Sequence, residues 1–211
     1  MISNLNSFIP NLDELKRRAE PHEDSRPSAE ALFVATGELR NAGYRDDNQK
    51  LFEVVRDYFA AELEHRNRRG LFLSGPAGIG KTFGIMVMAA RFGWPVIPAQ
   101  TFEEVWLSGE NTAGWDAFVQ GQDFFGKPRL IVIDDLGTEN CPVCRFGTSC
   151  NLLAEVLDTR YRVSFLRSGI RTIVTTNFND EQLRSRYGYR IDDRLNEMFQ
   201  FAAVGGKSLR G

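Results

Sequence analysis

One eight-residue segment, GPAGIGKT at positions 75–82, constrains the fold of this 211-residue chain more than any other part of the sequence. It follows the apolar run GLFLS and opens an apolar stretch with helical spacing, which is the context expected of a phosphate-binding loop. Glycines let such a loop turn tightly, so backbone N–H groups from about Ala77 to Thr82 point at phosphate oxygens, and the following helix adds the positive end of its dipole. A chance glycine-rich turn is the alternative, and the flanking strand and helix argue against it.

The expected ligands of this loop are ATP and Mg²⁺. We expect Lys81 to neutralise charge on the β and γ phosphates, and the Thr82 hydroxyl to ligate Mg²⁺. The predicted nucleotide-binding residues of the loop are Gly75, Pro76, Ala77, Gly78, Ile79, Gly80, Lys81 and Thr82.

Short apolar runs alternate with helical stretches along most of the chain. The expected strands are 70–75, 94–99, 129–135, 171–177 and 199–204, and the expected helices are 29–42, 46–66, 81–92, 101–108, 148–166, 179–185 and 190–198. This alternation predicts an α/β P-loop NTPase fold with three layers, in which helices cover both faces of a five-stranded, mostly parallel sheet.

The first 43 residues differ in composition from the rest. They contain three of the eight prolines, a short helix is compatible with 11–20, and Ser28 is a suitable N-cap for the helix at 29–42. Because this segment is too small to bury a core of its own, we expect residues 1–43 to form a partner-binding extension and residues 44–211 to form the ATPase domain.

Polar residues stand at the ends of two expected strands. RLIVIDDLGTE (129–139) places Asp134 and Asp135 after a buried strand, which predicts that Asp134 holds Mg²⁺ and that Asp135 orients the attacking water, with Glu139 as a second candidate for that role. Asn177 ends the strand RTIVTTN (171–177) and is expected to contact the γ-phosphate or the water. The ends of parallel strands meet at one edge of a sheet, so these side chains should converge on the phosphate loop.

Two arginines, Arg190 and Arg194, lie four residues apart in YGYRIDDRL (187–195) and therefore on one face of a helix. One interpretation is a solvated helix with local ion pairs to Asp192 and Asp193. The other is that one arginine reaches the phosphates of ATP, where a guanidinium stabilises charge on the transferred group.

Five segments together resemble a known family. They are GPAGIGKT, VIDDLGTE, TIVTTNF, RYGYRIDDRL and GGKSLR, and in this order and spacing they resemble the AAA+ ATPases of the DnaC/IstB type over about residues 44–211. These proteins are bacterial and phage replicative-helicase loaders and the ATP-binding helpers of insertion sequences. The resemblance implies a homo-oligomer formed on ATP or DNA, with single-stranded DNA and a replicative helicase as partners.

The resemblance also implies residue roles. Asn177 matches the sensor-1 residue, Arg190 matches the arginine finger that acts on a neighbour's ATP, and Arg210 in GGKSLR matches the sensor-2 arginine. Arg194 would support the subunit interface instead. Only one residue follows Arg210, so we expect little or no C-terminal lid.

Other functions remain open. A transposition helper shares every motif with a loader, although the net charge of −2 and the small, acidic-leaning N-terminus favour a loader. An interaction scaffold that hydrolyses little ATP is compatible with Asp rather than Glu at position 135. A small-molecule kinase fits less well, because Asn177, the finger-like Arg190 and the absent lid favour hydrolysis over transfer to an acceptor.

A possible DNA surface lies between residues 160 and 194, which hold eight arginines against four acids. In RYRVSFLR (160–167) the arginines alternate with aromatic residues, a pattern that suits single-stranded DNA. We expect Arg160, Arg162 and Arg167 to contribute to DNA binding. The alternative is an ordinary amphipathic helix whose arginines extend along its surface.

The cysteines and the apolar runs of the sequence bear on metal binding and on cellular location. CPVCRFGTSC (141–150) contains all three cysteines, but a structural zinc needs four ligands and no fourth Cys or nearby His is present, so we expect no zinc. No apolar run approaches the ~20 residues of a membrane span, and the start of the chain lacks the pattern of a signal peptide. We therefore expect no membrane partner and a cytoplasmic location.

Overall fold

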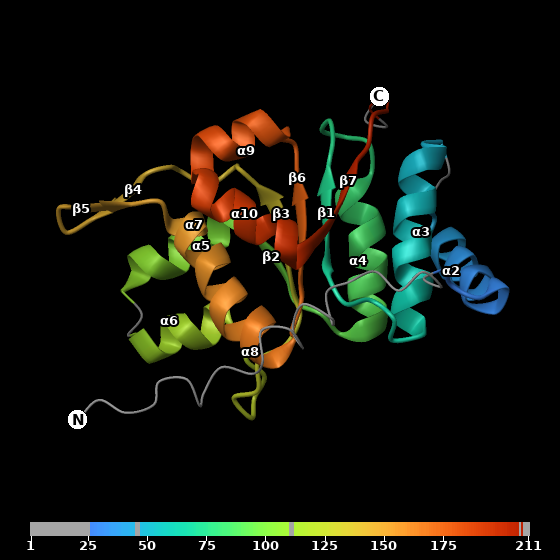
Figure 1. Cartoon of the computed structure of the whole chain (residues 1–211), viewed down its shortest axis with the longest axis horizontal. Helices are drawn as coiled ribbons and strands as arrows, with labels where there is room; N and C mark the ends of the chain where they lie inside the picture. Colours follow the sequence, from blue (N-terminus) through green and yellow to red (C-terminus); the bar gives the residue numbers. More distant parts are fainter. Residues whose placement is uncertain (1–25, 45–46, 110–111, 207, 209–211) are drawn as a thin grey trace.

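A computed structural model of the chain describes residues 26–44, 47–109, 112–206 and 208 (Figure 1). The expected short helix at 11–20 and Arg210 lie outside the described residues. No helix in the described ranges is long and apolar enough to cross a bilayer.

The central sheet has five strands, all parallel to their neighbours. The strands are β1 (Gly70–Ser74), β2 (Val96–Pro98), β3 (Ile131–Leu136), β6 (Thr172–Thr176) and β7 (Phe199–Ala203). Their order across the sheet is β2-β3-β6-β1-β7. The prediction of a five-stranded parallel sheet is confirmed, and each strand lies within its expected range or one residue beyond it.

Helices cover both faces of the sheet and form two separate cores (Figure 1). Along β1, Leu71 and Leu73 enter the core shared with α2 (Ala29–Asn41), α3 (Gln49–Leu63) and α4 (Lys81–Phe92). Phe72 points to the opposite core. The helices on that side are α5 (Ala99–Ser108), α6 (Thr112–Val119), α7 (Leu152–Thr159), α9 (Asp180–Tyr187) and α10 (Tyr189–Met198). The period-two alternation of the strands therefore produces the expected three-layer α/β/α arrangement.

Helix α2 begins as predicted, because the Ser28 hydroxyl accepts a hydrogen bond from Ala31 N at 3.1 Å. Its buried residues Ala31, Ala35 and Leu39 pack into the core that α3 and α4 share. The helix thus rests on the remainder of the fold and has no core of its own. The division of the chain at residue 43 stays a prediction.

The segment between β3 and β6 differs from the prediction of one helix at 148–166. Residues 143–150 form an antiparallel hairpin of β4 (Val143–Arg145) and β5 (Thr148–Cys150), which projects away from the sheet in Figure 1. Phe146 and Gly147 both have positive φ, as a two-residue hairpin turn requires. Helix α7 then begins at Leu152, directly after its N-cap Asn151, and continues as the π-helix η2 (Arg160–Phe165) and the short α8 (Leu166–Ser168).

Helix α6, which precedes β3, was not predicted.

Candidate nucleotide site

Three strand ends meet at one edge of the sheet. Strand β6 lies between β1 and β3, so the phosphate loop after β1, Asp134 near the end of β3 and Asn177 after β6 become neighbours. A groove of about 380 Å³ runs along this edge. It is lined by Ser74, Gly75, Pro76, Asn177, Phe178, Asn179, Ala203, Val204 and Gly205.

Lys81 joins the phosphate loop to the end of β6. Its Nζ donates to the carbonyl oxygens of Gly75 (2.7 Å) and Pro76 (2.8 Å) and to Asn177 Oδ1 (2.7 Å). The residue is only 5% exposed, so these acceptors replace the water that the ammonium group loses on burial. The predicted neighbours Lys81 and Asn177 are therefore in direct contact.

Thr82 and Asp134, the two predicted magnesium ligands, are also in contact. Thr82 Oγ1 donates to Asp134 Oδ1 at 2.9 Å, and Thr175 Oγ1 donates to the same oxygen at 2.5 Å. A hydroxyl and a carboxylate oxygen side by side are the hard oxygen donors that Mg²⁺ prefers. Thr175 was not among the predicted site residues, although its place one residue before the end of β6 puts it next to the expected magnesium ligands.

Asp135 has an unusual backbone. Its φ is 53°, and the pairing of β3 with β6 shifts register between Ile133 and Leu136. Thr175 Oγ1 accepts a hydrogen bond from Asp135 N at 2.9 Å, which holds this irregular segment against β6. Such bulges re-aim side chains and concentrate near active sites. The bulge thus lies at the two adjacent carboxylates, Asp134 and Asp135.

The residues present fit ATP and Mg²⁺. Gly80 has φ 98° and is the N-cap of the 12-residue helix α4, so the helix N-terminus begins directly at the loop. Lys81 supplies the cation for the phosphates, while the Thr82 and Asp134 oxygens could hold Mg²⁺. The parallel sheet with this loop after β1 and helices on both faces is the three-layer fold of a P-loop NTPase.

Comparisons with known proteins give partial likenesses. No model of a known protein family matches the chain. A stretch of 92 residues is 35% identical to the Replication factor C large subunit of Methanosarcina acetivorans, covering 39% of this chain and 14% of that protein.

Among solved structures, AMPPCP-bound DnaA from Aquifex aeolicus superposes with a TM-score of 0.48 at 16% identity, over 76% of this chain and 47% of that one. The Pif1 helicase from Candida albicans gives a TM-score of 0.41 at 12% identity, over 74% of this chain and 39% of that one. The chain thus spans less than half the length of these proteins.

Of the two arginines in YGYRIDDRL, only one is held within the fold. Arg194 forms an ion pair with Asp158, and its guanidinium lies 5.2 Å from the ring centroid of Tyr161. Arg190, in the first turn of α10, is exposed and has no hydrogen-bond or ion-pair partner among the described residues. Arg190 is therefore available to a group outside the subunit, and Arg194 is not.

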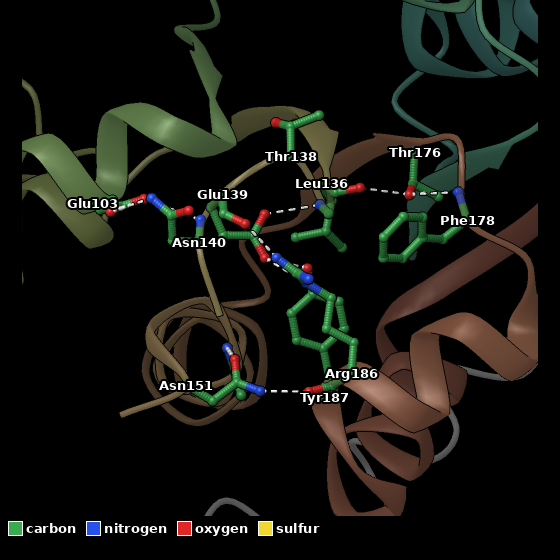
Figure 2. Close-up of polar contacts among 12 residues, drawn as sticks. Glu103, Leu136, Thr138, Glu139, Asn140, Asn151, Thr176, Phe178, Arg186 and Tyr187 are labelled. Atoms are coloured by element: carbon green, nitrogen blue, oxygen red, sulfur yellow. Dashed lines mark hydrogen bonds and ion pairs between the residues drawn. The ribbon is translucent and has the colours of Figure 1, made fainter. Parts of the chain in front are cut away.

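Glu139 requires a correction. It is 4% exposed, and its carboxylate accepts hydrogen bonds from Gly137 N (2.8 Å), Arg186 Nε (3.1 Å) and Tyr187 Oη (2.6 Å) (Figure 2). A carboxylate whose oxygens are both engaged inside the fold is poorly placed to orient water. The arrangement contradicts the predicted catalytic role of Glu139.

The predicted DNA-binding role of Arg160 is wrong. Arg160 is fully buried and donates to the carbonyl oxygens of Gln120, Arg129 and Arg171 and to the Thr172 hydroxyl. Burial lowers its pKa to about 9, so the side chain still carries its charge at neutral pH. The charged guanidinium is therefore held inside the fold and is not exposed at the surface.

The other two arginines of that predicted DNA surface are exposed. Arg162 pairs with Asp158 at 2.7 Å, one helical turn earlier, and Arg167 lies at the end of the same helical segment. Their role in DNA binding stays a prediction.

The three cysteines lie on and around the hairpin. All are unpaired, and no group of three or more candidate metal ligands occurs in the described part of the chain. Burial and, next, the charge of Glu155 raise the pKa of the Cys150 thiol, which disfavours the thiolate that a metal requires. The expectation that zinc is not bound stays a prediction.

Proposed function

We propose that this chain is a Mg²⁺-dependent ATPase of DNA replication, which assembles on single-stranded DNA and loads a replicative helicase. The observation that carries the ATPase part is the convergence of Lys81, Thr82, Asp134 and Asn177 at one edge of the sheet. The name of a relative that matches part of the chain, the Replication factor C large subunit of Methanosarcina acetivorans, supports the assignment to replication.

Each residue has a specific task in this proposal. Lys81 and the N-terminus of α4 bind the phosphates, and Thr82 with Asp134 hold Mg²⁺, which when bound neutralises phosphate charge. Asp135 orients the attacking water, and Asn177 hydrogen-bonds the γ-phosphate. A neighbour's Arg190 then stabilises the charge that develops during hydrolysis, and Arg210 contacts the nucleotide as well.

The ATPase is tested by measuring ATP turnover with and without single-stranded DNA. Lys81→Ala should abolish binding of ATP and turnover, because it removes the only cation among the described residues of the loop. Arg68→Ala is the matched control, since Arg68 is exposed just before β1, at the opposite end of that strand. ATP binding with negligible turnover even on DNA would replace the ATPase with an interaction scaffold.

The trans action of Arg190 is tested by mixing two inactive proteins. Lys81→Ala subunits have no working ATP site but carry Arg190, and Arg190→Ala subunits have the site but lack the finger. Mixed assemblies should recover turnover at the Arg190→Ala sites. No recovery would mean that Arg190 does not act across an interface.

The partner is tested by direct binding. A purified replicative helicase should be retained by the immobilised chain with ATP present, and a transposase should not. The opposite result would favour the transposition helper, which uses the same ATP site.

A further inference from the structure

Glu139 lies at the centre of a buried polar cluster outside the phosphate site. The carboxylate binds Arg186 and Tyr187, the last two residues of α9, and Arg186 also donates to the Glu139 carbonyl oxygen (Figure 2). We call Glu139, Arg186 and Tyr187 the clasp. It connects the segment after β3 to the end of α9.

Neighbouring residues pack closely against the clasp. The Arg186 guanidinium lies 5.6 Å from the ring centroid of Phe178, and a Cβ on Gly137 would come within 2.8 Å of the same ring. Burial, followed by the charge of Glu139, raises the pKa of Tyr187, so its hydroxyl remains a donor to Glu139. Asn151 Nδ2 adds a bond of 2.5 Å to the carbonyl oxygen of Arg186.

The two ends that the clasp joins both belong to the proposed ATPase chemistry. On one side, Glu139 follows Asp134 and Asp135 along the chain. On the other, only Gly188 and Tyr189 separate Tyr187 from Arg190. Gly188 has φ 83° and caps α10 without a side chain, so the first turn of α10 takes its direction from the end of α9.

We propose that the clasp positions Arg190, by fixing the first turn of α10 relative to β3 so that the guanidinium projects toward the nucleotide of a neighbouring subunit. The inference rests on the proposed function, because it assumes that Arg190 acts in trans. Glu139, Arg186 and Tyr187 touch no reacting atom and are positioning residues.

The body of α10 has its own anchors, which separate positioning from folding. Ile191, Leu195 and Met198 are buried in the core, and Arg194 is paired with Asp158. Loss of one clasp hydrogen bond should therefore leave α10 folded, while the exposed side of its first turn, which carries Arg190, gains freedom. A displacement of about 1 Å at a reacting group can reduce a rate about 100-fold.

The test uses the two-subunit mixing assay, in which the clasp can be altered on one side at a time. Tyr187→Phe keeps the ring and removes the hydroxyl bond, and Glu139→Gln keeps the shape and removes the charge. In the Lys81→Ala subunit, which donates Arg190, each should reduce recovered turnover about 10- to 100-fold. In the Arg190→Ala subunit, which supplies the ATP site, Tyr187→Phe should change turnover less than about twofold, with KM for ATP unchanged.

The test compares the loss of turnover when the clasp is altered in the subunit that donates Arg190 with the loss when it is altered in the subunit that supplies the ATP site. Equal losses on both sides would show that the clasp supports the fold in general and would overturn the positioning role, as would undiminished turnover with a Tyr187→Phe donor. If the parent pair recovers no turnover, trans action itself fails and the positioning role falls with it. Thermal unfolding of each variant identifies a misfolded Glu139→Gln protein, and Tyr187→Phe then carries the test alone.

Discussion

Arg160 in the π-helix η2 and Arg190 in the first turn of α10 have opposite surroundings. Arg160 is fully buried, and its guanidinium donates to three backbone carbonyl oxygens and one hydroxyl. Arg190 is exposed and has no hydrogen-bond or ion-pair partner among the described residues. Arg160 joins the segment before β3 to the start of β6, whereas Arg190 remains available to a second molecule.

Two other arginines of the described residues, Arg171 and Arg186, resemble Arg160 in being held by partners inside the fold. Arg171 forms a bidentate ion pair with the buried Glu62, and Arg186 forms an ion pair with Glu139. Because a buried cation without acceptors is costly, these side chains are fixed by the partners that surround them. An exposed arginine without a partner, such as Arg190, has no such structural task in the subunit and is the better candidate for function.

The largest expected effect follows from removing the exposed arginine. Arg190→Ala should reduce turnover of the assembled protein by about 10³-fold or more, while the free energy of unfolding changes by less than about 0.5 kcal/mol. Steady-state turnover and urea denaturation measure the two quantities, and Arg68→Ala serves as the surface control. A large loss of stability, or full activity, would remove the distinction between Arg190 and Arg160.

Removing the buried arginine should have the reverse signature. Arg160→Met leaves three carbonyl oxygens and the Thr172 hydroxyl without their donor, so we expect a loss of about 3–5 kcal/mol in the free energy of unfolding. Arg160→Lys keeps the charge but has fewer hydrogen-bond donors, so its free energy of unfolding should fall by less. Urea denaturation of both variants measures the effect. Unchanged stability together with weakened DNA binding would restore the surface role that the sequence suggested.

Features set by neighbouring residues could be predicted from the sequence. The strands and the phosphate loop follow from such local patterns, because apolar runs and glycine spacing are properties of contiguous residues. The convergence of Asp134 and Asn177 on the phosphate loop was predicted from topology, since the ends of parallel strands meet, and the contacts of Thr82 with Asp134 and of Lys81 with Asn177 agree with it. These inferences needed only that the strands run parallel.

The errors concern residues whose environment is set by distant segments. RYRVSFLR reads as a basic, aromatic surface, but all four acceptors of Arg160 come from other segments, at Gln120, Arg129, Arg171 and Thr172. Glu139 reads as a spare catalytic acid, yet two of its three donors lie almost fifty residues later, at the end of α9. The hairpin at 143–150 was the exception, because its Phe146–Gly147 turn and the N-cap Asn151 were local signals.

A smaller effect is expected from the ion pair between Arg171 and Glu62. Glu62 Oε1 accepts from Arg171 at 2.7 Å, and the pair ties α3 to the segment just before β6. Glu62→Ala leaves a largely buried guanidinium with the Tyr58 hydroxyl as its remaining side-chain partner, so we expect a loss of about 2–3 kcal/mol. Turnover per folded subunit should not change, and a selective loss of turnover would mean that α3 contributes to the ATP site.

The smallest effect is expected from the exposed arginines beside Arg160. Arg162 gains little from its surface ion pair with Asp158, so the double variant Arg162→Ala/Arg167→Ala should change the free energy of unfolding by less than about 0.5 kcal/mol. If both side chains contact phosphates of single-stranded DNA, the slope of log K against log salt should fall by roughly 0.7 for each lost contact. Fluorescence anisotropy over a salt series measures that slope, with Arg68→Ala as the control. An unchanged slope would show that the 160–167 segment carries no DNA contact, because Arg160 is already held inside the fold.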